Sequence, residues 1–160
     1  MGWALQMKWL WWQRTSTDRA WSGLEIPCHP HARRMFAISM ITNVGYGRNT
    51  LFWTDRWLHG CSLVDMALEV AACLQSRILK TRTAEETLDN RVWVQDIRGG
   101  LSLNGLIEFL KLWDALLNFT LTNEDDQHIW KHAILGSFLS KTTYNAFFYG
   151  SIQFEPWRCL

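Results

Sequence analysis

The stretch GYGRNTLFWTDRWL, residues 45–58, decides the fold that the sequence predicts. Its two glycines lie one residue apart between two apolar runs, a pattern typical of a hairpin loop. The phenylalanine and two tryptophans that follow are too many large apolar side chains for a surface, so we expect them in a core. The structural motif expected here consists of Gly45, Gly47, Phe52, Trp53, Asp55 and Trp57. Asp55 is expected to accept hydrogen bonds from nearby backbone or indole N–H groups.

The segments beside these glycines predict strands. From residue 36 to residue 44 the sequence alternates with a period of two, which favours a strand with one buried face. Residues 50–54 are expected to return as the partner strand, which gives a β-hairpin near 36–54. Residues 127–133 also alternate, with Trp130 as the expected buried member, and Gly136 follows as a turn. A second short hairpin is therefore expected near 127–139.

Helical patterns predict most of the remaining structure. They occur over residues 3–14, 63–79, 103–119 and 142–148. The closest fit to helical spacing is the apolar stripe formed by Leu103, Leu106, Ile107, Leu110, Trp113 and Leu117. Residues 81–98 show no clear pattern. The expected class is α+β, mostly helical, with a β-hairpin near 36–54 and a second short one near 127–139.

Composition and charge limit the classes of function. The chain has 160 residues, of which 48% are apolar and 19% charged, as is typical of a globular domain. Its 16 Lys and Arg residues are balanced by 15 Asp and Glu residues, whereas proteins that grip nucleic acid through its phosphates normally carry a basic excess. The apolar run at residues 9–12 is far too short to span a membrane. We expect an intracellular protein with reduced cysteines, in the nucleus or the cytoplasm.

Zinc-type ligands occur in two groups. Cys28, His29 and His31 form the first group, and His59 and Cys61 form the second. Structural zinc sites usually contain pairs spaced as C-x2-4-C or H-x3-5-H, and neither group contains one. Loop histidines near prolines are common without any metal. We therefore expect neither a metal site nor a cofactor.

The other catalytic patterns are incomplete. The glycine pair begins a dinucleotide-binding fingerprint, but Thr50 stands where that motif needs its third glycine. His128 and His132 have the spacing of a metalloprotease helix, but Ile129 replaces the required Glu. The Asp-Asp pair at 125–126 has Asn, not Tyr, at the position that a Y-x-D-D polymerase motif requires. We therefore expect no catalytic residues.

Four segments, taken in order, resemble one family. They are ALQMKWLWWQRT (4–15), the glycine loop with FWTDRWLHG (45–60), LWDALLNFTLTNEDDQHIW (112–130) and SKTTYNAFFYGS (140–151). The chain is similar to plant LINE-type, non-LTR retrotransposon reverse transcriptase polyproteins, in the region between the polymerase domain and the reverse transcriptase zinc-binding domain. The family pattern F-W-x-D-x-W is matched in full at 52–57, whereas Tyr46 replaces the Asp or Asn of the family's G-D/N-G loop.

The resemblance implies two parts. Residues 1–125 correspond to the connector region after the polymerase domain, and residues 126–160 to the incomplete start of a reverse transcriptase zinc-binding domain. The segment LGSFLSK at 135–141 departs from the family's D-G-x-Y/F-S-x-K. The family's Cys/His cluster would follow Leu160, and its polymerase carboxylates would precede Met1. The resemblance thus implies a fragment whose partners are the missing polymerase and zinc modules.

The function that follows from this resemblance is that of a non-catalytic structural connector, not an enzyme. One alternative is a stand-alone nucleic-acid-binding module, in which arginines interleaved with aromatic side chains contact RNA or DNA. Arg48 and Arg56 are the candidate nucleic-acid contacts. Another alternative is the product of a decayed element with no selected function, for which exposed tryptophan patches and poor solubility are expected.

Overall fold

The computed structural model describes residues 2–16, 24, 27–88, 91–133 and 136–148. The chain divides into two compact units. The terminal unit combines both ends, residues 1–39 and 130–160, and the central unit contains residues 40–129. The boundary implied by the family resemblance, between residues 125 and 126, concerns modules of a longer protein and stays a prediction.

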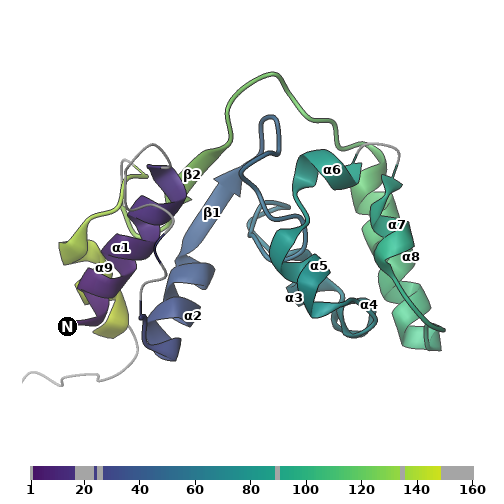
Figure 1. The fold of residues 1–160 in the computed structure, drawn as a ribbon, viewed down its shortest axis with the longest axis horizontal. Coiled ribbons are helices and arrows are strands. Elements are labelled where there is room, and N and C mark those ends of the chain that lie inside the picture. The colour runs from purple at the N-terminus through teal and green to yellow at the C-terminus, as the bar shows by residue number, and fades with distance from the viewer. Residues whose placement is uncertain (1, 17–23, 25–26, 89–90, 134–135, 149–160) are drawn as a thin grey trace, which may run out of the picture. The chain divides into compact units, whose positions relative to one another are not determined.

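The terminal unit packs its described helices around one tryptophan. These helices are α1 (Trp3–Thr15), α2 (Pro30–Ser39) and α9 (Ser140–Phe148), and α1 packs against the other two (Figure 1). Trp130 is fully buried, with its ring centroid 6.2 Å from that of Trp11, 5.9 Å from that of Phe36 and 4.9 Å from that of Phe138. The helices predicted at 3–14 and 142–148 are confirmed, and so is the burial of Trp130.

The central unit contains the other described elements. They are β1 (Met40–Asn43), α3 (Leu63–Met66), α4 (Leu68–Ala72), α5 (Ser76–Thr81), α6 (Ala84–Leu88), α7 (Trp93–Asp96), α8 (Leu103–Leu117) and β2 (Gln127–Trp130), whose last residue falls in the terminal unit. Their core is an aromatic cluster around Phe52, Trp53 and Trp57, extended by Trp93 and leucines of α3 and α8. The predicted class, α+β and mostly helical, is confirmed.

The hairpin predicted near 36–54 is wrong in its pairing, although a strand lies in that segment. The second one, predicted near 127–139, contains β2 and also residues 134 and 135, which lie outside the described residues. Residues 36–39 belong to α2, and Pro30 at its first position is pre-organised for a helix. Ala32, Phe36 and Ser39 are buried at helical spacing, so the alternation at 36–44 was only in part a strand signal. Strand β1 pairs antiparallel with β2, far along the chain, and not with a neighbour across a tight turn.

The predicted return strand, residues 50–54, pairs with another segment. The Phe52 N–H donates to the Arg82 carbonyl at 2.9 Å, and the Ala84 N–H donates to the Thr50 carbonyl at 2.9 Å. These two bonds flank an isolated antiparallel bridge between residues 51 and 83. The glycine loop is therefore a turn, as predicted, but it connects β1 to this bridge instead of closing a hairpin.

The helix predicted at 63–79 is broken into α3, α4 and α5. The Ser62 hydroxyl caps α3 by accepting the Asp65 N–H at 3.2 Å. The first break falls at Ala67, whose φ of −143° and ψ of 76° lie outside the helical region. No glycine or proline marks this break in the sequence, so apolar spacing alone predicted a continuous helix. Four apolar residues of this predicted helix are nevertheless buried, namely Leu63, Ala67, Val70 and Leu74.

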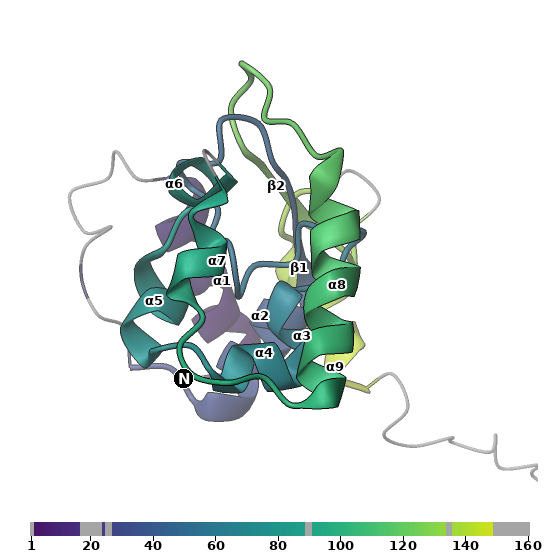
Figure 2. The same cartoon turned by 90° about the vertical axis from the view of Figure 1, so that its right-hand side faces the viewer.

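Helix α8 is where predicted, but it buries the opposite face. It packs against α3 and α4 (Figure 2) through a face that includes Leu112 and Leu116. Five of the six residues of the predicted stripe point outward: exposed fractions are 76% at Leu103, 46% at Leu106, 45% at Ile107, 56% at Leu110 and 49% at Leu117, whereas the sixth, Trp113, is half-buried and packs against the core. We call these five residues the α8 outer face.

A partly buried polar contact favours this orientation. Helix α4 begins at Leu68 without a side-chain cap, which leaves backbone N–H groups in need of acceptors. The Glu108 carboxylate of α8 accepts the N–H of Glu69 at 2.8 Å and that of Val70 at 3.3 Å. Turning Glu108 toward α4 directs the α8 outer face away from the core.

Candidate functional site

The glycine loop is closed by a carboxylate from a distant part of the chain. Asp126 Oδ1 accepts the backbone N–H groups of Gly45 and Gly47, each at 2.8 Å. Asp126 Oδ2 accepts the N–H of Asn49 and the hydroxyl of Thr50, each at 2.9 Å. Converging backbone N–H groups form an anion-binding nest. Here the nest is filled by an anion of the protein itself.

Both glycines of the loop are required by close approach of other backbone. A Cβ on Gly45 would lie 1.9 Å from the Glu124 carbonyl oxygen. A Cβ on Gly47 would lie 2.6 Å from the Glu85 nitrogen, and Gly47 also has a φ of +80°, which favours glycine. The Tyr46 N–H donates to the Glu124 carbonyl at 2.8 Å. The loop is thus held between the segment before β2 and the start of α6.

The electrostatics of Asp126 follow from these contacts. Burial raises the pKa of its carboxyl, but the N–H groups of Gly47, Gly45 and Asn49 and the Thr50 hydroxyl together hold that pKa below its usual value. The carboxylate is therefore charged at neutral pH. The Asp-Asp pair that matched no polymerase motif includes a residue that organises the loop.

The FWTDRW segment turns its large side chains inward. Phe52 and Trp53 are fully buried and Trp57 nearly so, and the Phe52 and Trp53 rings meet edge to face at 5.0 Å. The Trp57 indole N–H donates to the Phe52 carbonyl at 2.7 Å. Asp55 is 9% exposed and accepts the Leu51 N–H at 2.7 Å, which confirms the predicted role of Asp55 as a backbone acceptor.

The two arginines proposed to contact nucleic acid are each paired with a carboxylate. Arg48 Nε lies 2.9 Å from Glu85 Oε1, and this contact raises the pKa of Arg48. Arg56 donates to Asp65 at 2.9 Å and to the Gly60 carbonyl at 2.9 Å. Both cations are already partly neutralised, so phosphate binding there would compete with the protein's own acids. Their nucleic-acid role stays a prediction.

The zinc-type ligands lie in different units. Cys28, His29 and His31 belong to the terminal unit, where both imidazoles stack with Trp3, whereas His59 and Cys61 belong to the central unit. Within the described ranges, no three His, Cys, Asp or Glu side chains are grouped closely enough to hold a metal ion.

The remaining histidine pair makes separate contacts. The Nδ1 atom of His128 lies 3.0 Å from the Thr42 hydroxyl, across the paired strands. The Nε2 atom of His132 lies 3.0 Å from the Ser39 hydroxyl in the terminal unit. Burial, together with the charge of Lys131, lowers the pKa of His132.

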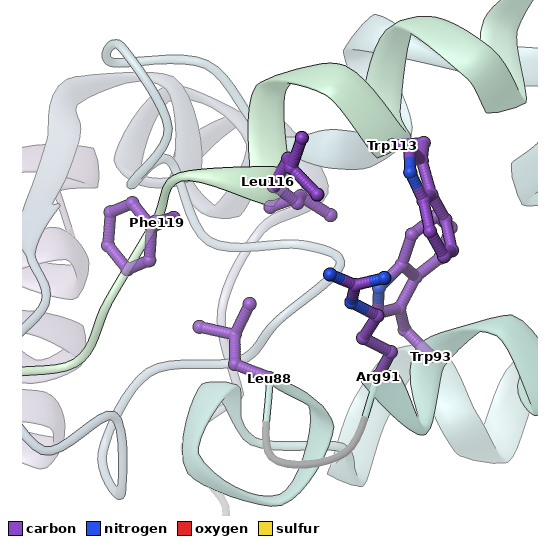
Figure 3. Close-up of a pocket in the computed structure, with 7 residues that line it drawn as sticks. Leu88, Arg91, Trp93, Trp113, Leu116 and Phe119 are labelled. Atoms are coloured by element: carbon purple, nitrogen blue, oxygen red, sulfur yellow. The ribbon is translucent and has the colours of Figure 1, made fainter.

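A pocket that sequence patterns did not indicate lies between α6, α7 and α8. It has a volume of about 200 Å³ and is lined by Leu88, Arg91, Trp93, Trp113, Leu116, Leu117 and Phe119 (Figure 3). Three of these residues come from 81–98, the stretch without a clear pattern. The sequence signal available was a basic residue two positions before a tryptophan, which is too common to indicate a site.

Comparison with protein-family models, with curated proteins and with solved structures finds no match to this chain. Among the described helices, none has both the length and the apolar character needed to cross a bilayer.

Proposed function

We propose that this chain is a non-catalytic structural connector of a non-LTR retrotransposon reverse transcriptase, packed against the polymerase and zinc-binding modules of the same polyprotein. The observation that carries this proposal is that its most distinctive motif faces inward. The aromatic residues of FWTDRW form the core, and Asp55 and Asp126 both accept backbone N–H groups. These residues hold the scaffold together.

The α8 outer face supports a role in packing against another module. Four leucines and one isoleucine occupy one side of a helix, each at least 45% exposed. Contiguous exposed apolar patches on soluble proteins commonly mark interaction sites. For a connector, the natural occupant is a neighbouring module of the same polypeptide.

The reading frame on either side of the coding sequence tests this proposal. We expect a polymerase Y-x-D-D motif upstream and a Cys/His cluster downstream. A frame that encodes neither, in an intact locus, would contradict the connector role.

A binding experiment tests the surface itself. The flanking modules, produced as separate chains, should bind the wild-type protein and should bind the double variant Leu106→Gln/Leu110→Gln at least tenfold more weakly, because burying two glutamines removes apolar contact and adds desolvation cost. Leu139→Gln provides a matched control, since Leu139 is 54% exposed but lies in the terminal unit. Equal weakening by the control would show that the effect is not specific to α8.

The alternatives receive less support. A nucleic-acid-binding module would use Arg48 and Arg56, which pair with Glu85 and Asp65. Salt-sensitive retention of single strands in a filter assay at micromolar protein would revive this alternative. The interpretation as an unselected product predicted exposed tryptophan patches; Trp3 of α1 is 43% exposed, whereas the exposed face of α8 consists of aliphatic residues.

A further inference from the structure

The pocket between α6, α7 and α8 combines aromatic walls with one cation. Its floor and sides come from Leu88 at the end of α6, Trp93 of α7, two leucines of α8, and Phe119 just after α8. Trp93 and Trp113 lie next to each other, with ring centroids 6.0 Å apart. Figure 3 shows the Arg91 guanidinium directed toward the space bounded by Leu88, Leu116 and Phe119.

Arg91 is exposed, stacks on an aromatic ring and has an unusual backbone conformation. Its guanidinium carbon lies 4.6 Å from the centroid of the Trp113 ring, a cation–π distance. Its φ of +55° is a left-handed conformation that costs a non-glycine residue about 1–2 kcal/mol. Residues held in such conformations cluster at ligand sites.

Arg91 differs from three other arginines of the central unit. Arg48, Arg56 and Arg82 each form an ion pair with a carboxylate. Within the described residues, the recorded partner of the Arg91 guanidinium is the Trp113 ring alone. A guanidinium stacked on an aromatic face still presents its N–H donors in the plane of the fork, where they match the oxygens of a carboxylate or phosphate.

We propose that this pocket binds a planar aromatic ring that carries an anionic group, the chemistry of a nucleotide. The pocket volume of about 200 Å³ is below the 300–1,000 Å³ of sites for drug-sized ligands, so it accommodates one ring system with its anion at Arg91. The aromatic and leucine walls cover the ring, and the guanidinium binds the anion. A neutral ring would form no ion pair with Arg91, and a bare anion would gain nothing from the walls. This proposal does not rest on the connector role, although Leu117 belongs both to the α8 outer face and to the lining of the pocket.

The test uses adenosine 5′-monophosphate, adenosine, inorganic phosphate and a six-nucleotide oligoadenylate as probes of the whole chain. Binding is measured by isothermal titration calorimetry and saturation-transfer NMR. Arg91→Gln removes the charge and keeps a side chain of similar length, and Arg91→Lys keeps the charge without the fork. Arg98→Gln is the matched control, because Arg98 is exposed and does not line the pocket. Thermal melts establish that each variant is folded.

We expect adenosine 5′-monophosphate to bind more tightly than adenosine or phosphate. Arg91→Gln should weaken nucleotide binding about tenfold and adenosine binding less than twofold, Arg91→Lys should retain part of the affinity, and Arg98→Gln should match the wild type. Binding of the oligoadenylate alone, with the same dependence on Arg91, would identify a nucleic-acid strand as the source of the ring and its anion. Binding of no probe at millimolar concentration, or equal binding by folded Arg91→Gln, would overturn the proposal.

Discussion

Asp126→Ala is the substitution that most directly tests the account of the glycine loop. The change removes both carboxylate oxygens and with them four hydrogen bonds, from the N–H groups of Gly45, Gly47 and Asn49 and from the Thr50 hydroxyl. These bonds join segments that lie 76–81 residues apart in the sequence. The loop would lose its main attachment to the segment before β2.

The expected loss of stability follows from the number and exposure of these bonds. A hydrogen bond to a charged group contributes about 1.5–3 kcal/mol, and a buried donor left unsatisfied costs about 1–3 kcal/mol. Asp126 is only partly buried, so water reaches some of the freed donors. We therefore expect Asp126→Ala to lower the free energy of unfolding by about 2–4 kcal/mol, out of a typical total of about 5–15 kcal/mol.

Urea denaturation followed by tryptophan fluorescence measures this loss, because Trp53 and Trp57 are buried close along the chain from the loop. Asp125→Ala is the matched control, since Asp125 is the exposed neighbour of the same residue type. A surface substitution of this kind should change stability by less than about 0.5 kcal/mol. If Asp126→Ala and Asp125→Ala unfold at the same urea concentration, the reasoning about the nest is refuted.

The remaining predictions concern pH, the loop glycine and a buried ion pair. The pKa of Asp126 is lower in the folded protein than in the unfolded chain, where it is about 3.9. The stabilisation by the charged carboxylate is therefore complete above the unfolded pKa and is lost as the pH falls through the folded pKa. In urea titrations at lower pH, the free energies of unfolding of the wild type and of Asp126→Ala should converge. Gly45→Ala should lower the free energy of unfolding by at least about 2 kcal/mol, because the new Cβ would overlap the backbone of Glu124. Gly100→Ala is the control: a Cβ at Gly100 meets nothing within 4 Å, so this variant should be near neutral in the same assay. Asp96 is 6% exposed, and both oxygens of its carboxylate accept hydrogen bonds from Arg82. Asp96→Ala removes these acceptors and should lower the free energy of unfolding by about 1–3 kcal/mol. An unchanged melting temperature in a thermal melt would contradict this prediction.

Local patterns in the sequence predicted the features that depend on neighbouring residues. Helices α1 and α8 were expected from their apolar spacing, and the inward role of Phe52, Trp53 and Trp57 from the size of these side chains. The turn at the glycines was also expected. Each of these properties is decided by burial or backbone preference within one or two helical turns, and such preferences can be seen in one segment alone.

Long-range pairing was decided only by the tertiary structure. Nothing near β1 indicates that its partner is β2, and nothing near Gly45 indicates that Asp126 closes the loop, since these partners lie about eighty residues away. The apolar positions of residues 36–44 fit the buried face of a helix as well as that of a strand. The choice between them came from packing in the terminal unit, where Ala32 and Phe36 are buried.

The orientation of α8 shows the same limit. The sequence by itself predicted a leucine-rich helix over residues 103–119, which the structure forms at Leu103–Leu117. Which face enters the core was decided by the need of α4 for an acceptor, which Glu108 supplies at 2.8 Å from the Glu69 nitrogen. A helix with two apolar sides has two comparable ways to pack, and the difference between them lies in the hydrogen bonds of its neighbour, which the helix's own sequence does not contain.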